Sequence, residues 1–557
     1  MNIFLVSQVA PWFLLGMLCI VLFTCITSLP IMFKSFKQLN KIITVLFLLT
    51  LCVGAYIRFA WVPNTHRIYF DEDRYLMYAV SFARTGHALG IEIATPQAIL
   101  KGDPDPGARV TVPLIHAIVL KLFGYKDANL FITAKALSTL QIALVFIYVI
   151  TLFKRPVGAL FASICIALLP ITVFWSVTTN LDSLFVLFGL LTGIASVLYA
   201  NKTSITTSAF LFASFSLLLF VRIEGILFLP IIILTVYTIR KQAGQKLIAR
   251  KDWGFILSTG ILLLLRLIVG LPLFTKTWCC AEATPLEIFQ AGYFIRNTIP
   301  NLQTLFIQPE FPFMVTVLAF LGIASGLISL YANTAGLVVA RTRILILWTI
   351  EYFFLYSFYY AGVFYSFTFS GSYGRFFLML VPPLVILASL TLDACVALFQ
   401  KSSYKQKTTI LTITALCLLT LFPTILNYKT YIRISPWDNL VDAGPRIIRA
   451  FMTDDVLPTI KHPAVIIHPL TAVVLMNGYS AVSLEAFIMH KQAREFVEAQ
   501  LKKGIPAYIM DTSFCDQSPY KCKEILEKFV FVPYHVSQKA DERGFAVKEV
   551  QLKNSSL

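Results

Sequence analysis

The chain has 557 residues, of which 57% are hydrophobic and only 13% are charged. One or two water-soluble cores could not bury this much apolar surface, so the composition predicts a polytopic membrane protein and excludes a disordered, fibrous or disulfide-stapled chain. The formal net charge of +17 does not indicate nucleic-acid binding, because the Lys and Arg residues lie between hydrophobic segments instead of gathering in one polar domain.

Apolar segments of roughly 17 to 25 residues, long enough to cross a bilayer, recur along the chain. About twelve are predicted to be transmembrane helices, and they lie near 11–33, 41–62, 134–153, 157–175, 182–200, 203–220, 224–240, 253–273, 313–332, 344–362, 376–399 and 409–427. The first has no basic residue before it and no cleavage site after it, so we interpret it as a retained helix and not as a signal peptide.

The loops on one side of these segments are basic. They contain Lys34, Lys37 and Lys41; Lys154 and Arg155; Lys202; Arg240, Lys241, Lys246, Arg250 and Lys251; Arg341 and Arg343; Lys401, Lys405 and Lys407. The positive-inside rule predicts that these loops are cytoplasmic. Both termini and two long loops, 63–133 and 274–312, then lie on the outer face, and we expect a multi-pass protein of the plasma membrane.

The sequence changes character after Tyr428. Helical patterns at 491–503 and 521–529 alternate with short apolar runs at 464–468, 505–511, 529–536 and 544–550. We therefore expect three parts, which are an extra N-terminal helix with a basic loop (1–40), a transmembrane domain (41–427) and an extracytoplasmic α/β domain (428–557). In the last part Cys515 and Cys522 lie close in sequence, and both a disulfide in an oxidising compartment and two free thiols stay open.

Three consecutive carboxylates follow the second apolar segment. The string His66-Arg-Ile-Tyr-Phe-Asp71-Glu72-Asp73-Arg74-Tyr75 leads into a helical pattern over 75–84. Neighbouring like charges raise the pKa of at least one carboxyl group unless a cation or a substrate compensates, so the cluster indicates a functional site. Capping of the following helix by Asp71 to Asp73 is the alternative that stays open. The same loop continues into a second apolar helix pattern, 112–123, which contains His116.

Five short motifs, taken in chain order, resemble integral-membrane glycosyltransferases of the GT-C type, especially protein O-mannosyltransferases and the aminoarabinose transferases of lipid A. They are Phe70-Asp71-Glu72-Asp73-Arg74-Tyr75; Val112-Pro-Leu-Ile-His116 with Lys121-Leu-Phe-Gly124; Thr178-Thr-Asn-Leu-Asp182-Ser; Val221-Arg222-Ile-Glu224-Gly225; and Ser372-Tyr373-Gly-Arg375, which leads to Pro382-Pro383. No single motif is specific, but all five lie within 41–427 and at the same predicted membrane face. Together with the hydropathy pattern, the resemblance implies a mainly α polytopic membrane protein of the GT-C type, with about twelve transmembrane helices and a C-terminal extracytoplasmic α/β domain.

The resemblance implies an inverting glycosyltransferase, which moves a sugar from an undecaprenyl- or dolichyl-phosphate donor to an acceptor hydroxyl of a glycan, lipid or protein outside the membrane. Asp71 matches the family's first acidic position and is predicted to be the base that takes the acceptor proton, while Glu72 positions the acceptor or the base. Asp182 matches a second acidic position, where it would hold the acceptor or orient a basic side chain. Its alternative role is a helix N-cap.

The leaving phosphate needs cations, and the planar guanidinium of Arg binds phosphate oxygens in pairs. Arg375 is predicted to be the main ligand of the donor phosphate, and Arg222 is the second, although Glu224 could neutralise it. Arg266 lies inside an apolar segment, where a charge is costly, and is either a phosphate ligand or a snorkelling residue. Contacts to the acceptor or the sugar are assigned to Asp73, His116 and Tyr373.

No cofactor is firmly implied, because the sequence has neither a zinc-spaced Cys/His set nor a Walker-type glycine loop. Some lipid A transferases carry a Glu-Lys pair where this chain has Ala108-Arg109, so a divalent metal is without support from the sequence. The expected partners are the polyprenyl-phosphate-linked sugar, its acceptor and membrane lipid, with no nucleic acid.

Two other classes of protein would explain part of the sequence. A secondary transporter or lipid flippase also suits about twelve spans, but transporters place charged groups near the bilayer midplane in paired halves. This chain instead concentrates its acids in an outer loop. A non-catalytic surface receptor would explain the C-terminal part but not the cluster Asp71 to Asp73.

Overall fold

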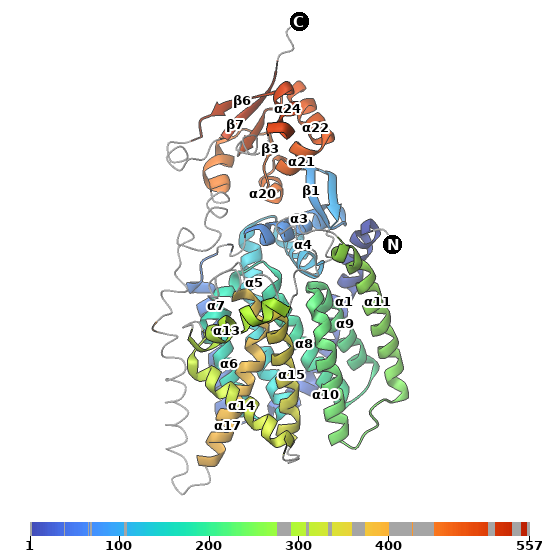
Figure 1. Ribbon diagram of the computed structural model, residues 1–557, viewed down its shortest axis with the longest axis vertical. Helices are drawn as coiled ribbons and strands as arrows, with labels where there is room; N and C mark the ends of the chain where they lie inside the picture. Colours follow the sequence, from blue (N-terminus) through green and yellow to red (C-terminus); the bar gives the residue numbers. More distant parts are fainter. Residues whose placement is uncertain are drawn as a thin grey trace.

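The computed structural model is a bundle of long helices with a smaller α/β unit above one end (Figure 1). The structure describes residues 3–37, 39–64, 66, 69–104, 109–275, 291–307, 311–331, 337–358, 374–399, 426, 451–510, 519–536 and 547–553. All statements below concern these residues.

The bundle helices follow the predicted apolar segments. They are α1 (Ile3–Lys37), α2 (Lys41–Tyr56), α5 (Asp127–Phe153), α6 (Pro156–Leu168), α7 (Pro170–Phe174), α8 (Leu181–Asn201), α9 (Ile205–Val221), α10 (Phe228–Gln242), α11 (Trp253–Thr275), α13 (Ala291–Ile307), α14 (Phe313–Tyr331), α15 (Leu337–Phe358) and α17 (Val381–Phe399). Every predicted segment coincides with one or two of these helices except 409–427, which lies outside the described residues apart from Leu426. The helix α13 was not predicted, because it lies in the long loop 274–312.

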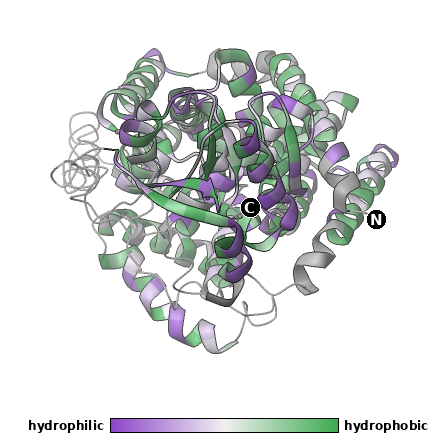
Figure 2. Ribbon diagram, turned by 90° about the horizontal axis from the view of Figure 1, so that it is seen from above, coloured by the Kyte–Doolittle hydropathy of each residue, from purple (hydrophilic) through white to green (hydrophobic). Residues whose placement is uncertain are grey.

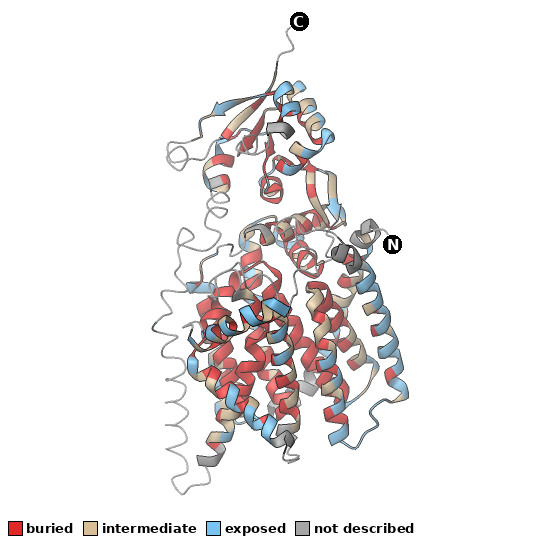
Figure 3. Cartoon of the chain, in the orientation of Figure 1, coloured by how far each residue is buried: buried red, intermediate tan, exposed pale blue. Residues whose placement is uncertain are grey.

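The bundle has the surface of a membrane protein. Within the described ranges five helices are long and apolar enough to cross a membrane, and the number is six if the bent pair 156–168 and 170–177 forms one span. Figure 3 shows α11 largely exposed, and its exposed side chains include Leu257, Ile261 and Leu264. Seen from above, hydrophobic residues occupy much of the outer rim of the bundle (Figure 2). The prediction of a mainly helical membrane protein is confirmed, while the count of about twelve spans stays a prediction.

The centre of the bundle is α8, in which every residue from Leu181 to Ala200 is buried. Its sequence is apolar on all sides, which is typical of a helix surrounded by other helices. It packs against α5, α9 and α10. The first turn of α8 therefore has a fixed place in the bundle, and this turn carries Asp182.

A buried arginine, Arg58, binds the backbone at the sharp bend between α6 and α7. The helices α6 and α7 meet at 54°, because Pro170 lacks the N–H that would bond to the carbonyl of Ile166. Arg58, in the π-helical segment η1 (Ile57–Trp61), is fully buried and donates to the carbonyls of Ile166 at 2.8 Å and Ala167 at 2.9 Å. The guanidinium thus satisfies backbone acceptors that the break leaves open.

The smaller unit contains a seven-stranded sheet in the order β2-β1-β4-β3-β5-β7-β6. Strand β3 (Val465–Ile467) is parallel to β4 (Ser480–Val482) and β5 (Ala507–Met510), whereas β7 (Val547–Leu552) is antiparallel to β5 and β6 (Phe529–Tyr534). The helices are α20 (Thr471–Met476), α21 (Leu484–Met489), α22 (Lys491–Lys502) and α24 (Pro519–Lys528), with the short turns η6 (Phe451–Val456) and η7 (Leu457–Thr459) before them. The predicted strands correspond to β3, β5, β6 and β7, but β4 was missed. Cys522 is buried and disulfide-bonded, and Cys515 lies outside the described residues.

Two strands of this sheet come from the first long loop of the bundle, which the sequence did not predict. The hairpin of β1 (Leu89–Ala94) and β2 (Ile99–Pro104) lies between helices α3 (Tyr69–Thr85) and α4 (Thr111–Phe123), and β1 pairs antiparallel with β4. Helix α3 lies between the bundle and the smaller unit (Figure 1) and shares a hydrophobic core with α20. Arg84 Nη2 also donates to the Leu475 carbonyl at 3.1 Å. The orientation of α3 is therefore fixed from two sides.

Candidate active site

Asp71 and Arg375 form an ion pair at the end of the bundle below the α/β unit. Asp71 lies in the first turn of α3, and Arg375 lies in the short helical segment η5 (Gly374–Met379), which leads into α17. Arg375 Nη1 donates to Asp71 Oδ2 at 2.6 Å, and 36% of the Asp71 side chain is exposed against 15% of Arg375. The structure thus brings the predicted base and the predicted phosphate ligand into direct contact, and the carboxylate stays reachable from outside.

The arginines around Asp71 determine its charge. Burial acts to raise the pKa of Asp71, but the attraction of the Arg375 guanidinium, with further contributions from Arg109 and Arg222, outweighs it. The pKa of Asp71 therefore lies below its ordinary value, and the group is a carboxylate at neutral pH.

Asp182 lies between two guanidiniums. Its Oδ1 accepts from Arg222 Nη1 at 2.5 Å, and its Oδ2 lies 3.9 Å from Arg375 Nε. The N-cap of α8 is Asn180, whose side chain accepts from the Leu181 N–H at 2.7 Å, so the capping alternative for Asp182 is wrong. Asp182 instead contacts both arginines, and its two expected roles, holding the acceptor or orienting a basic side chain, stay predictions.

A tight turn holds Arg222 at this place. Arg222 follows α9 and precedes the 3-10 turn η3 (Ile223–Leu227), and Gly225 permits the turn because a Cβ there would lie 3.0 Å from the Leu218 carbonyl oxygen. Arg222 Nε lies 3.6 Å from Glu224 Oε1, which is longer than its contact with Asp182. Glu224 therefore neutralises Arg222 only in part.

Both arginines also lie against one aromatic ring. The guanidinium carbons of Arg222 and Arg375 are 4.9 Å and 5.0 Å from the centre of the Phe376 ring. Phe376 is buried, and its ring centre lies 5.3 Å from that of Tyr356. Cation–π attraction holds the two like charges near each other, and two guanidiniums side by side favour an anion. Phe376 directly follows Arg375 in the last of the five motifs, but the resemblance implied no role for Phe376.

Glu72 makes its contacts elsewhere. Its side chain is fully buried, its Oε1 accepts from Thr178 Oγ1 at 2.8 Å, and its Oε2 accepts from Thr179 Oγ1 at 2.9 Å. His66 Nδ1 lies 2.5 Å from Oε2. Asp71 and Glu72 lie in the first turn of α3, where the helix dipole stabilises negatively charged side chains. The capping alternative alone does not account for these side-chain partners.

His116 lies close to the Glu72 contacts. Burial lowers the pKa of His116 to about 4, an effect that Glu72 and Asp127 oppose and His66 reinforces. The imidazole is therefore neutral at pH 7, and its Nδ1 has no hydrogen-bond partner within the described part of the chain. A contact of His116 with acceptor or phosphate stays a prediction.

The remaining predicted residues are spread more widely. Asp73 is buried beside Glu72 in α3. Arg266 is buried in α11, where its Nε donates to the Leu219 carbonyl at 3.3 Å and its guanidinium carbon lies 5.3 Å from the Phe220 ring. Tyr373 lies outside the described residues. The roles proposed for these three residues are not tested by the structure.

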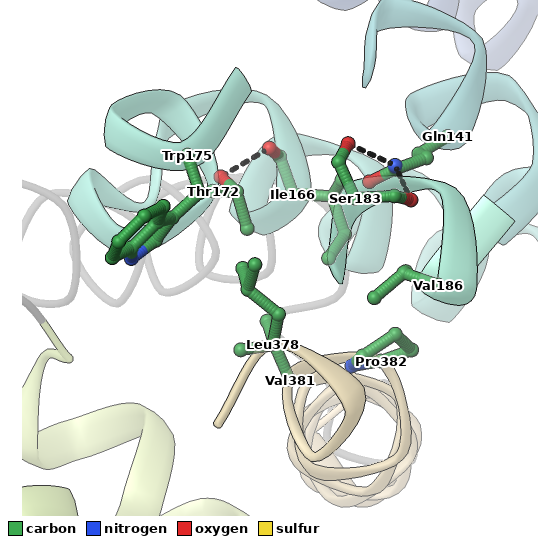
Figure 4. A pocket seen from close by; sticks show the side chains of 9 residues that line it. All are labelled: Gln141, Ile166, Thr172, Trp175, Ser183, Val186, Leu378, Val381 and Pro382. Atoms are coloured by element: carbon green, nitrogen blue, oxygen red, sulfur yellow. Dashed lines mark hydrogen bonds between the residues drawn. The ribbon is translucent and has the colours of Figure 1, made fainter. Parts of the chain in front are cut away.

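A small cavity lies below the acidic cluster, between α5, α6, α7, α8 and the start of α17 (Figure 4). Its volume is about 10 Å³, enough for a single water molecule. On its polar side Gln141 Nε2 donates to the carbonyl and the hydroxyl of Ser183, at 2.7 Å and 3.0 Å. The other lining residues are Ile166, Thr172, Trp175, Val186, Leu378, Val381 and Pro382. This cavity is too small for a sugar, so we do not assign it to a substrate.

The residue types present do not form a metal site in the described ranges. No group of three or more His, Cys, Asp or Glu side chains there is arranged to hold a metal ion. The guanidiniums of Arg375 and Arg222 contact the carboxylates of Asp71 and Asp182.

Comparisons with known proteins give a family match over part of the chain and a shared fold. Residues 108–269 match the family model of dolichyl-phosphate-mannose-protein mannosyltransferase. The structure of ArnT from Cupriavidus metallidurans in the apo state matches with a TM-score of 0.51 and 12% identity, over 91% of this chain and 97% of that chain. ArnT bound to undecaprenyl phosphate gives a TM-score of 0.49 at 13% identity, over 91% and 97% of the two chains. The apo oligosaccharyltransferase of Archaeoglobus fulgidus gives 0.48 at 11% identity, over 94% of this chain and 75% of that chain. No curated protein matches the sequence.

The match to apo ArnT shows that this chain has the same fold. At 12% sequence identity the match supports a shared fold and not a shared activity. Together with the family-model match, it confirms the resemblance to GT-C type membrane glycosyltransferases that the sequence motifs indicated.

Proposed function

We propose that the protein is an inverting glycosyltransferase that moves a sugar from a polyprenyl-phosphate donor to an acceptor hydroxyl at the outer face of the membrane. The observation that carries this proposal is the cluster of Asp71, Arg375, Asp182 and Arg222, in which a reachable carboxylate lies beside two guanidiniums. The partial match to a mannosyltransferase family and the fold shared with apo ArnT support it. The undecaprenyl phosphate and dolichol-phosphate bound in structures of ArnT and of the archaeal oligosaccharyltransferase suggest the class of donor.

In this proposal Asp71 is the general base. A single displacement inverts the anomeric centre, and it needs one carboxylate to take the proton of the acceptor hydroxyl as that oxygen attacks. Asp71 is ionised and partly exposed, so it can accept this proton. Its lowered pKa makes it a weak base in the free protein, because a base works best when its pKa lies near the operating pH.

The donor phosphate would strengthen this base. Arg375 and Arg222 are the proposed ligands of the phosphate, and Arg375 is also the partner that lowers the pKa of Asp71. A phosphate bound to Arg375 shares its positive charge and loosens the contact with Asp71. The pKa of Asp71 then rises, so the base becomes effective only when the donor is present.

The other predicted residues keep supporting roles. Asp182 holds the two guanidiniums in place, and Arg266 contributes to the donor site from α11. Asp73, His116 and Tyr373 contact the acceptor or the sugar. The acceptor is a hydroxyl of a glycan, a lipid or a protein.

We also propose that the α/β unit lies outside the cytoplasm and that about twelve helices cross the membrane. Figure 1 shows the α/β unit at one end of the bundle and the connection from α10 to α11 at the opposite end. That connection carries the basic residues Lys241, Lys246 and Lys251, which the positive-inside rule places in the cytoplasm. The disulfide-bonded Cys522 suits an oxidising compartment. We keep the predicted division into 1–40, 41–427 and 428–557 as part of this proposal, with the hairpin β1–β2 added to the last part.

The decisive experiment uses the full chain in lipid nanodiscs with undecaprenyl- and dolichyl-phosphate-linked radiolabelled sugars and a cell-envelope extract as acceptor. Asp71→Asn should lower transfer about 10²- to 10⁴-fold, the usual contribution of a general base, while undecaprenyl phosphate binds at least as tightly as to wild type, because Arg375 no longer pairs with a carboxylate at position 71. Asp103→Asn, which changes an exposed acid of the same loop, is the control and should keep full activity. Unchanged turnover in Asp71→Asn contradicts the assignment. Donor that crosses the bilayer of sealed proteoliposomes without being cleaved would favour a flippase instead.

A further inference from the structure

The contacts of Glu72 connect the two segments that carry the acids of the proposed site. Glu72 follows Asp71 in α3, and both of its oxygens accept hydrogen bonds from the pair Thr178–Thr179. This pair precedes Asn180, the N-cap of α8, and Asp182 in the first turn of that helix. Hydrogen bonds to a charged group are about twice as strong as neutral ones. Glu72 therefore ties the position of α3 to the start of α8.

A second side chain extends this connection to α5. His66 Nδ1 lies 2.5 Å from Glu72 Oε2, and its Nε2 lies 3.3 Å from Asp127 Oδ2 in the first turn of α5. An imidazole can donate from both nitrogens only when it is protonated, so the arrangement suits an imidazolium between two carboxylates. The ring also packs 4.7 Å from the ring of Phe131. Three elements, α3, α5 and the segment before α8, thus meet at His66 and Glu72.

The burial of Glu72 argues against a direct catalytic role. Its side chain has no exposed surface, and Thr178, Thr179 and His66 already bind its oxygens. A substrate could reach the carboxylate only after these contacts broke, and removing a partner from a buried charge is costly. A residue of this kind acts on its neighbours and not on the substrate.

We propose that His66, Glu72, Asp127, Thr178 and Thr179 form a positioning network that fixes the distance between Asp71 and the Asp182–arginine cluster. This proposal rests on the proposed function, because it assigns these residues the task of presenting the base and the phosphate ligands in one geometry. Small displacements at a reacting centre have large kinetic effects, since about 1 Å of misplacement can cost 10²-fold in rate.

The network explains two features of the sequence that were otherwise without a role. Two adjacent hydroxyl residues, Thr178 and Thr179, stand before a helix whose N-cap is the next residue, so neither is needed for capping. Asp127 starts α5 far from the motifs that indicated the site. Each is accounted for by the carboxylate or the imidazole that it contacts.

The test replaces the two threonines in the full chain. The double variant Thr178→Ala with Thr179→Ala should lower kcat by up to about 10²-fold, the loss that about 1 Å of misplacement of the base would cause, with donor affinity within about twofold. Thr178→Ser with Thr179→Ser keeps the hydroxyls and should recover most of the activity. Ser176→Ala is the matched control, because this buried hydroxyl bonds to the carbonyl of Val173, three residues before it.

The pH profile separates positioning from general loss of structure. Loosening α3 weakens the contact of Asp71 with Arg375, so the acid limb of kcat/KM should move to higher pH in the alanine variant. Loss of folded protein would instead lower the rate equally at all pH values. If the alanine variant keeps the wild-type kcat and its acid limb of kcat/KM lies at the same pH as in wild type, the proposal is overturned.

Hydrogen exchange tests the network without turnover. Faster exchange in both 71–85 and 178–185 is expected in the alanine variant, and Asp127→Asn should give a milder form of the same pattern. If wild-type protein fails to transfer sugar, the proposed function fails, yet the exchange pattern still decides whether the network exists. Unchanged exchange in both segments overturns it.

Discussion

Removing the guanidinium of Arg375 should change both donor binding and the pH dependence of the reaction. The Nη1–Oδ2 distance of 2.6 Å is that of a charge-assisted hydrogen bond. Such bonds contribute about 1.5–3 kcal/mol when they are protected from solvent. Because 36% of Asp71 and 15% of Arg375 is exposed, screening reduces this to about 1–2 kcal/mol. If a donor phosphate gains a similar contact, Arg375→Ala should weaken donor binding about 5- to 30-fold.

The pH dependence carries a sign that follows from the same contact. Burial raises the pKa of Asp71 and Arg375 is the first group that opposes it. Without Arg375 the pKa rises, so the acid limb of kcat/KM should move to higher pH, whereas rates well above that limb reflect the lost phosphate contact alone.

The assay measures undecaprenyl phosphate affinity by thermal shift and the kcat/KM of transfer across pH 3 to 8, each with the full chain in nanodiscs. Arg375→Lys keeps a positive charge without the planar fork and should lie between wild type and Arg375→Ala in both measurements. An unaltered donor affinity together with an unmoved acid limb in Arg375→Ala would refute the reasoning.

Two further predictions concern an ion pair away from the proposed site and the buried histidine assigned to it. Asp252 accepts hydrogen bonds from Arg240 Nη1 at 2.6 Å and from Arg240 Nη2 at 2.8 Å. Burial acts to raise the pKa of Asp252, but its hydrogen bonds, of which those from Arg240 have the largest effect, lower the pKa to about 2. Asp252→Asn should therefore destabilise the protein by about 3 kcal/mol at pH 7. Wild-type protein should lose the stability from this ion pair only as the pH falls below 3.8 toward 2. Thermal unfolding of both proteins across this pH range measures the effect. Burial lowers the pKa of His116 from 6.5 to about 4, so wild type should lose stability as pH falls through this interval, because the unfolded chain takes up the proton first. His116→Leu should flatten this loss in unfolding scans at pH 7.5 and 5, and an equally steep loss in the variant would contradict the assignment.

The helices of the bundle were predictable because lipid imposes a simple rule on sequence. A segment that crosses the bilayer must be apolar over its whole length, so the windows from 11–33 to 376–399 coincide with helices. The helix α13 escaped this rule because Asn297, Asn301 and Pro300 interrupt its apolar residues. Its polar side chains are buried against Ser357 of α15, a pairing that hydropathy does not report.

The site was predictable in part, and for a different reason. Asp71, Asp182, Arg222 and Arg375 lie in separate motifs, and only the order of those motifs indicated that they belong together. Their contacts depend on how α3, α8, α9 and η5 pack, which no local pattern encodes. The same limit applies to Glu72, which was expected to position the acceptor or the base. No local pattern indicated that its partners are Thr178, Thr179 and His66. His66 and Asp127 carried no signal beyond their residue type.

The hairpin β1–β2 was missed because its strands are short, and alternation over six residues is weak evidence for a strand. The other edge of β1 pairs with β4, near the other end of the chain, and no local pattern reports this second pairing.

The shared sheet has a consequence for how the protein is made. The hydroxyl of Thr471 donates to the carbonyl of Ile91 across a separation of 380 residues, so the ribosome has released most of the chain before β1 meets its neighbour. Until then β1 presents an open edge that other chains can join. A nascent or prematurely terminated polypeptide would therefore hold its helix α3 without support, and we expect sugar transfer to begin only after synthesis of the last domain is complete.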